Sequence, residues 1–289
     1  ARLAALRAHR DPEARQVTST MTPPTRSEAG LRSLYAGNAR AGVGRGLLAT
    51  RSTNWAIILT GVFEPIFYLL ALGLGLGSYI TGVTDAQGNV IPYAAFIAPA
   101  LLAVSAMNGA IYDSTWNVFF KMHFGKLYQG MLATSLGPLD VALGEISLAL
   151  LRGAAYGTTF LLVMTALGLN LSWTAILALP AILVIAFGFA SLGMGITSYL
   201  KSFQQMEWVQ FVMLPMFLFS ATFYPLTVYP EPIQWFIQAL PLWHGVELVR
   251  GLTTGALTPA MLLHLLYFLV MIAVGLVFTT RRLKALFLD

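Results

Sequence analysis

The chain contains no cysteine and few charged residues, and each shortage excludes a class of protein. Only 10% of the 289 residues are charged, whereas 57% are hydrophobic. A soluble domain carries about 25% charged residues, so a water-soluble fold of this composition would expose a large apolar surface. Without cysteine there are no disulfides, no thiolate metal ligands and no cysteine nucleophile. The composition therefore predicts an integral membrane protein.

Sequence motifs for metal binding and for ATP binding are also lacking. The four histidines are scattered and form no HExxH-like pair, so no metal site is predicted. The only Gly-Lys dipeptide is Gly125-Lys126, and Phe120 stands where a Walker A motif needs its first glycine. We therefore expect no ATP site, no metal site and no catalytic residues in this chain. Energy for transport would have to come from a partner or an ion gradient.

Long apolar stretches are what the chain has in abundance. A bilayer core about 30 Å thick is crossed by a helix of about 20 apolar residues. Six stretches meet this length, and they predict an all-α, polytopic integral membrane protein with six transmembrane helices. The approximate ranges of the predicted spans are 55–77, 93–112, 146–169, 173–200, 209–228 and 260–280.

Basic residues are distributed unevenly between the expected loops. Nine arginines precede the first span, and Arg281, Arg282 and Lys284 follow the last. The loop at 78–92 has no lysine or arginine. By the positive-inside rule both termini are expected in the cytoplasm, which agrees with an even number of spans. Topology thus explains the net charge of +5, and no nucleic-acid partner is expected.

The part of the chain before the first span is expected to have two segments. Residues 1–27 are rich in arginine and proline and predict a disordered basic tail. No apolar h-region follows these charges, so a signal peptide is not expected. Residues 28–52 place apolar residues among four arginines, which favours an amphipathic interfacial helix over an irregular linker. The transmembrane domain itself is expected over 53–285.

Two segments between spans do not look like ordinary loops. Residues 116–138 form the longest expected cytoplasmic loop between spans and combine aromatic residues with lysines, with a helix expected from about Gly125 to Ser135. This apolar surface meets either a partner or the ends of the protein's own helices. Residues 229–250 are apolar but interrupted by prolines, which predicts a re-entrant helical hairpin before the last span.

Two charged residues fall inside predicted spans. Glu64 lies in the first span and Arg152 in the third, at similar expected depth. A charge at membrane depth costs about 3 kcal/mol and usually has a partner. We hypothesise that Glu64 pairs with Arg152. The pair would either hold helices together or form a polar wall of a translocation path.

Several stretches, taken together and in this order, resemble the permease subunits of type-2 ABC exporters. Within that superfamily the chain is similar to the branch of nodulation protein J and the daunorubicin-resistance permeases. The carrying stretches are EPIFYLLALGLGLG at 64–77, FIAPALLA at 96–103, LYQGMLAT at 127–134, LGE at 143–145, PMFLFS at 215–220 and PLWHGVELVR at 241–250.

The resemblance implies an assembly and a location. Two cytoplasmic P-loop ATPase subunits, which hold the ATP and Mg²⁺, would bind two permeases, either two copies of this chain or this chain and a paralogue. The complex would lie in the bacterial cytoplasmic membrane. It would export an amphipathic substrate that is lipid-linked, glycosylated or like a hydrophobic drug, because the branch includes lipooligosaccharide exporters and drug-resistance pumps.

The resemblance also implies roles for particular residues. Spans one, two and five would line the path, and the re-entrant segment would form an outer gate. The expected ATPase-coupling residues are Phe119, Phe120, Lys121, Phe124, Lys126, Leu127, Tyr128 and Met131. The expected path residues are Glu64, Phe67, Asn108, Arg152 and Phe219, and the expected gate residues are Trp235, Trp243, His244 and Glu247.

Other readings of the sequence stay open. An ion-coupled secondary transporter tends to carry internal repeats, and we find no convincing repeat between 55–151 and 173–280. A membrane-embedded enzyme or assembly factor would need polar groups that match a reaction, and none matches. His244 and Glu247, beside Arg250, either contact a polar head group or cap the re-entrant helix.

Overall fold

The computed structural model describes residues 37–40, 42–44, 63, 66–80, 82–84 and 88–287. The basic tail predicted at 1–27, most of the interfacial helix predicted at 28–52, and Glu64 lie outside these residues. The described residues are mostly helical, as expected. They also include a small antiparallel hairpin of β1 (Val83–Thr84) and β2 (Val90–Ile91).

Four helices among the described residues are long and apolar enough to cross a membrane. The first combines α4 (Tyr93–Tyr112), the π-helical turn η5 (Asp113–Asn117) and α5 (Val118–His123) into one rod. The second is α7 (Pro138–Ala166). The third joins η6 (Trp173–Leu177) to α8 (Ala178–Thr197). The fourth is α12 (Ala260–Phe287).

The helices begin and end where local chemistry requires. Pro138, at the first turn of α7, needs no backbone N–H there, so this helix starts well before the span expected at 146–169. Ser172 precedes η6, and its hydroxyl accepts a hydrogen bond from the N–H of Thr174. Of the first predicted span, the structure describes an apolar helix at Ile66–Ser78, which ends in η3 (Ala71–Gly75) and η4 (Leu76–Ser78).

The continuous helix predicted over 209–228 is not found. After η7 (Phe203–Met206), α9 runs over Glu207–Phe219 and has only 13 residues, about 20 Å of helix. The Ser220 hydroxyl then donates to the carbonyl of Met216, and Ala221 adopts a left-handed φ of 54°. The apolar run continues past this point, but the helix does not.

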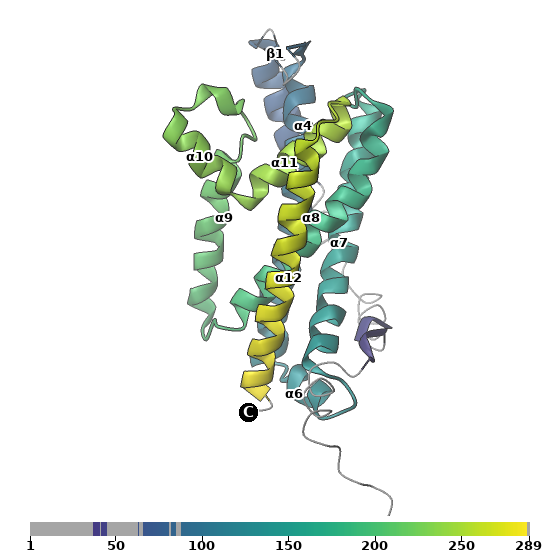
Figure 1. The fold of residues 1–289 in the computed structure, drawn as a ribbon, viewed down its shortest axis with the longest axis vertical. Coiled ribbons are helices and arrows are strands. Elements are labelled where there is room, and N and C mark those ends of the chain that lie inside the picture. Colours follow the sequence, from purple (N-terminus) through teal and green to yellow (C-terminus); the bar gives the residue numbers. More distant parts are fainter. Residues whose placement is uncertain are drawn as a thin grey trace, which may run out of the picture.

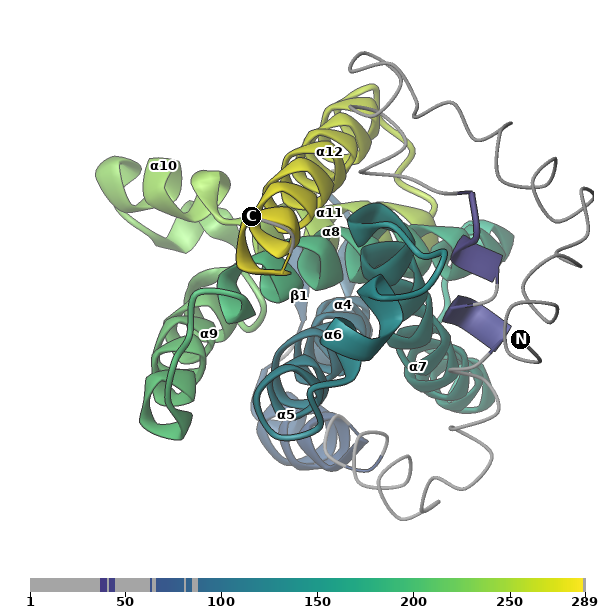
Figure 2. The same cartoon turned by 90° about the horizontal axis from the view of Figure 1, so that it is seen from below.

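The segment after α9 forms short helices, and their re-entry into the membrane stays a prediction. These are η8 (Leu226–Val228), α10 (Glu231–Ala239) and α11 (Pro241–Thr254). α9 and α10 stand to one side of the bundle in both views (Figure 1, Figure 2). α11 instead packs on α4, α8 and α12.

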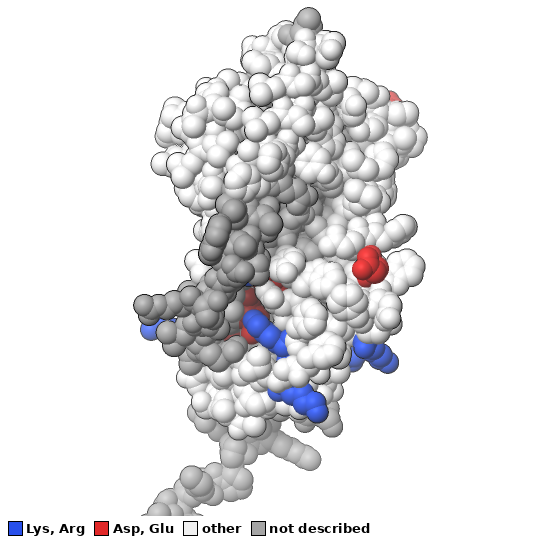
Figure 3. Space-filling view, turned by 180° about the vertical axis from the view of Figure 1, so that it is seen from behind, with Lys and Arg blue, Asp and Glu red and all other residues white. Residues whose placement is uncertain are grey.

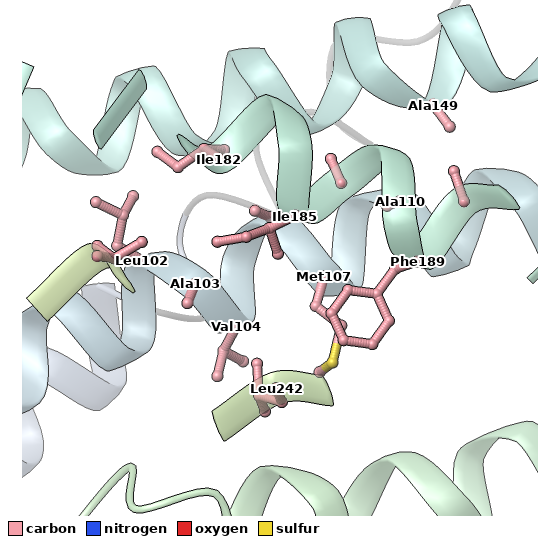
Figure 4. Close-up of a cluster of buried hydrophobic side chains, with 14 of the residues drawn as sticks. Leu102, Ala103, Val104, Met107, Ala110, Ala149, Ile182, Ile185, Phe189 and Leu242 are labelled. Atoms are coloured by element: carbon pink, nitrogen blue, oxygen red, sulfur yellow. The ribbon is translucent and has the colours of Figure 1, made fainter. Parts of the chain in front are cut away.

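The core of the bundle lies around α4, which contacts α7, α8 and α11. Figure 4 shows Leu102 and Met107 of α4 beside Ile185 and Phe189 of α8 and Leu242 of α11. Small residues bring the helices close together. A Cβ on Gly109 of α4 would lie 3.0 Å from the Tyr156 ring of α7.

One end of the molecule holds the short helix α6 (Leu127–Leu132) and the end of α12 (Figure 1). Lysine and arginine side chains gather toward this end on the face drawn in Figure 3, and the opposite end of that face shows none. The bundle thus has a basic end and an end with little charge on that face.

Candidate functional site

A helical hairpin at the basic end carries exposed aromatic side chains. α5 and α6 are joined by residues 124–126, and Lys126 turns the chain with a left-handed φ of 46°. Phe120, Phe124 and Leu127 are 45%, 70% and 38% exposed. An apolar surface of this kind at the end of a bundle is unfavourable in water unless a partner covers it. The hairpin is therefore a candidate contact site for another protein.

Three of the side chains predicted to face a partner point into the protein instead. Phe119, Tyr128 and Met131 are almost completely buried. Phe119 stacks on the ring of His123, with 4.4 Å between the centroids. The expectation that they face outward is wrong in this structure, because each short helix has an inner face that packs on the bundle. The helix expected from Gly125 to Ser135 is likewise shorter, since α6 ends at Leu132.

An ion pair attaches the hairpin to α7. The Nζ atom of Lys121 in α5 lies 2.5 Å from the Oε2 atom of Glu145, whose side chain is buried. Asp140, in the first turn of α7, accepts hydrogen bonds from the N–H groups of Gly137 at 2.9 Å and Asn38 at 3.1 Å. A carboxylate at this position also interacts favourably with the helix dipole. α7 thus contacts both the hairpin and a segment that precedes the first span.

A second ion pair, deeper in the bundle, joins α7 to the rod that contains α4, η5 and α5. The Arg152 Nε atom of α7 lies 2.9 Å from the Asp113 Oδ2 atom of η5, and both side chains are largely buried. The side-chain amide of Asn117, one turn further along, also donates to Asp113. Among the described residues, the Nη1 atom of Arg152 has no hydrogen-bond partner. Arg152 is thus paired with Asp113. Glu64 is not among the described residues, so the hypothesis that it pairs with Arg152 stays a prediction.

In one ion pair the rod that contains α4 supplies the positive charge and α7 the negative charge, and in the other pair the signs are reversed. The rod of α4, η5 and α5 carries Asp113 and then Lys121, whereas α7 carries Glu145 and then Arg152. A slip of about two helical turns would bring Asp113 opposite Glu145 and oppose two negative charges. The paired charges therefore favour one register between α7 and its neighbour.

A cavity of about 160 Å³ lies between the helix at Ile66–Ser78, α4 and α9. Its polar lining comes from the side chains of Tyr68, Asn108 and Gln210, and its other lining residues are apolar. Of the predicted path residues, Asn108 lines this cavity. Phe67 and Phe219 are exposed and are not among its lining residues.

Sequence comparison decides the family of this chain. The family described as ABC-2 type transporter matches residues 40–254, which include the hairpin, both ion pairs and the cavity. The chain belongs to this family. It is therefore a membrane component of an ABC transporter and a multi-pass protein of the cytoplasmic membrane.

Curated relatives of this ABC-2 permease carry the name nodulation protein J. The protein of that name from Rhizobium leguminosarum bv. viciae is 32% identical over 83% of this chain and 91% of its own length. The one from Sinorhizobium fredii is 33% identical over 71% of this chain and 77% of its own length. The one from Neorhizobium galegae is 29% identical over 83% of this chain and 91% of its own length. The resemblance to this branch is thus confirmed over most of the chain.

The end of the ABC-2 permease opposite the hairpin holds the predicted gate residues. Trp235 of α10 is 74% exposed, whereas Trp243 and His244 of α11 pack against α12. The Nδ1 atoms of His244 and His264 lie 2.8 Å apart. His244 therefore makes an internal contact in this structure, and its role in a gate stays a prediction.

Glu247 also makes a contact within the chain. Its Oε1 atom lies 2.5 Å from the Nη1 atom of Arg250, and Arg250 Nη2 donates to the carbonyl oxygen of Ala221 at 2.8 Å. The hydrogen bond from Arg250 to Ala221 joins α11 to the segment that directly follows α9. Both His244 and Glu247 make internal contacts, and neither side chain caps the start of α11. Contact with a polar head group, the other alternative, stays a prediction.

Three residues of these sites escaped the sequence analysis. Phe203, in the connection from α8 to α9, is 48% exposed and lies 6.3 Å from the Phe120 ring. Gln210 lines the cavity opposite Asn108. His264 forms no motif with the other histidines, but an ionisable residue inside an apolar span signals a functional or packing role. The contact between Phe203 and Phe120 joins residues far apart in the sequence, so only the folded structure shows it.

Proposed function

We propose that this chain is the permease subunit of an ATP-driven exporter whose α5–α6 hairpin docks on a cytoplasmic P-loop ATPase. The observation that carries the proposal is the exposed surface of Phe120, Phe124 and Leu127 on a hairpin that is ionically attached to α7. Basic residues gather at the same end, which by the positive-inside rule is the cytoplasmic one (Figure 3). Two ATPase subunits would hold ATP and Mg²⁺, since this chain has no Walker A motif.

Motion of the ATPase would reach the membrane through rigid rods. The rod of α4, η5 and α5 has 31 residues and α7 has 29, so each extends from the hairpin region across the bundle. The pairs Lys121–Glu145 and Asp113–Arg152 tie the rods at two levels. Closure of the ATPase subunits would therefore displace both rods together rather than bend either one.

The cavity between α4 and α9, at about 160 Å³, would hold only part of a substrate, and its lining suits an amphipathic one. The side-chain amides of Asn108 and Gln210 offer donors and acceptors, and most of the surrounding wall is apolar. A lipid-linked, glycosylated or hydrophobic drug-like molecule has both kinds of surface. α9 buries only Met216 within this chain, so a second permease, either a copy or a paralogue, would cover its exposed side and complete the path.

An ion-coupled secondary transporter is not favoured, because the family match is to membrane components of ABC transporters. The test is purification of the full chain from its native membrane in mild detergent, with mass spectrometry of what stays bound. A P-loop ATPase in near-equal amount is the expected result. Transport that survives ATP depletion and stops when the proton gradient is collapsed would overturn the proposal.

A further inference from the structure

A groove on the outer surface of α12 combines apolar walls with two arginines. It encloses about 590 Å³ near the basic end of the bundle. Its walls include Tyr199, which follows α8, and Val274, Val277 and Phe278 of α12. Arg281 and Arg282 stand at its basic end. None of the coupling or path residues lines it.

The charged end of the groove has no acidic partner among the residues that the structure describes. Its lining contains no aspartate or glutamate, and the ion pairs within the described part of the chain do not involve Arg281 or Arg282. The Arg282 guanidinium lies over the Tyr199 ring at 4.2 Å, and its buried Nε atom has no hydrogen-bond partner among the described residues. An anion placed here would meet two arginines that no described carboxylate neutralises.

The apolar part of the groove continues along the helix. Val270, Val274 and Val277 of α12 are each more than half exposed. From Arg281 to Val270 the helix rises about 16 Å, which is the length scale of an acyl chain. Tyr199 contacts both parts, because its ring stacks on Phe278 and lies under the Arg282 guanidinium. Tyrosine side chains are common at the boundary between the apolar core of a membrane and water.

We propose that this groove binds an anionic phospholipid of the cytoplasmic leaflet. Its phosphate would contact Arg281 and Arg282, because arginine binds phosphate oxygens with several N–H donors. One acyl chain would lie along Val277, Val274 and Val270. The site goes beyond the proposed export function, since it lies on α12 rather than at the cavity between α4 and α9. Only the assignment of the leaflet rests on the proposed orientation.

Native mass spectrometry of the full chain tests this site. The purified protein is incubated with equal amounts of phosphatidylglycerol and phosphatidylcholine, and bound lipid is counted. Wild type is expected to retain phosphatidylglycerol preferentially. Because a basic residue near anionic lipid changes affinity about fivefold, Arg281→Gln with Arg282→Gln should weaken phosphatidylglycerol binding about 25-fold. Val274→Trp, which keeps both charges, should weaken it by filling the groove.

A charge-matched double variant provides the control. Lys126→Gln with Lys201→Gln removes two exposed charges outside the groove and should leave phosphatidylglycerol binding within about twofold of wild type. Circular dichroism checks that each variant keeps its helical content. Equal binding of the two lipids by wild type, or equal losses in the two double variants, would overturn the proposal.

Discussion

Two helices of this permease have similar apolar sequences and opposite surroundings. In the rod that contains α4, 83% of the most apolar 18-residue stretch is buried, whereas the corresponding figure for α12 is 22%. α4 packs on α7, α8 and α11, whereas α12 packs chiefly on α8. Hydropathy alone marks both as membrane helices and does not separate them.

The difference between them is in side-chain size and in charge. α4 is rich in alanine and contains Ser105 and Gly109, which let neighbouring helices approach. α12 presents large branched side chains outward, among them Leu262, Leu266 and Val270. The central rod also carries Asp113 in a buried ion pair. In a membrane protein, small and polar residues thus mark the core, while the most apolar surface is suited to contact lipid.

The largest effect is expected from the charge in the central rod. Asp113→Asn leaves Arg152 buried without its anion, which should lower the free energy of unfolding by about 3–5 kcal/mol. Unfolding in mixed micelles with increasing dodecyl sulfate measures the change. Asp113→Asn combined with Arg152→Gln removes both charges and should recover more than half of the loss. A double variant no more stable than Asp113→Asn would show that the pair does not act as a unit.

An intermediate effect is expected from side-chain size. Gly109→Leu places a side chain against the Tyr156 ring, and overpacking should lower the free energy of unfolding by about 1–3 kcal/mol. Val270→Leu on the exposed face of α12 is the matched control, with an expected change within about 0.5 kcal/mol. The same unfolding assay measures both. Equal losses would contradict the difference drawn between the two helices.

The smallest effect is expected from one hydrogen bond between α12 and α8. Thr279 Oγ1 donates to the Ser191 carbonyl oxygen at 3.0 Å, so Thr279→Val should lower the free energy of unfolding by about 0.6 kcal/mol. Thr280 is its buried neighbour, and its hydroxyl has no hydrogen-bond partner among the described residues. Thr280→Val should therefore change stability little. Identical stability changes in the two variants would show that the Thr279–Ser191 hydrogen bond does not stabilise the fold.

Much of the fold could be predicted because local signals agree. The predicted range 93–112 has the same bounds as α4, whereas α7 starts at Pro138, before the span expected at 146–169. The helix predicted over 209–228 failed because hydropathy does not register the turn at Ser220 and Ala221. An apolar run can continue after its helix has ended.

The sites were less predictable because they depend on contacts between distant residues. The composition of the loop indicated a protein contact, but only packing decides that Phe124 is exposed and Tyr128 buried. The charge of Arg152 required a partner, but the sequence does not single out Asp113 for that role. The register of α7 against its neighbour brings these two residues together, and the pairing of Glu64 stays a prediction.

The most direct test of the central claim is how much P-loop ATPase stays bound when the outer face of the hairpin is truncated. Phe124→Ala with Leu127→Ala removes exposed side chains without touching the buried Tyr128. Trp235→Ala, at an exposed aromatic side chain on α10, is the matched control. We predict that the hairpin variant loses the ATPase at least tenfold while the control retains it. Full retention by the hairpin variant would contradict the account.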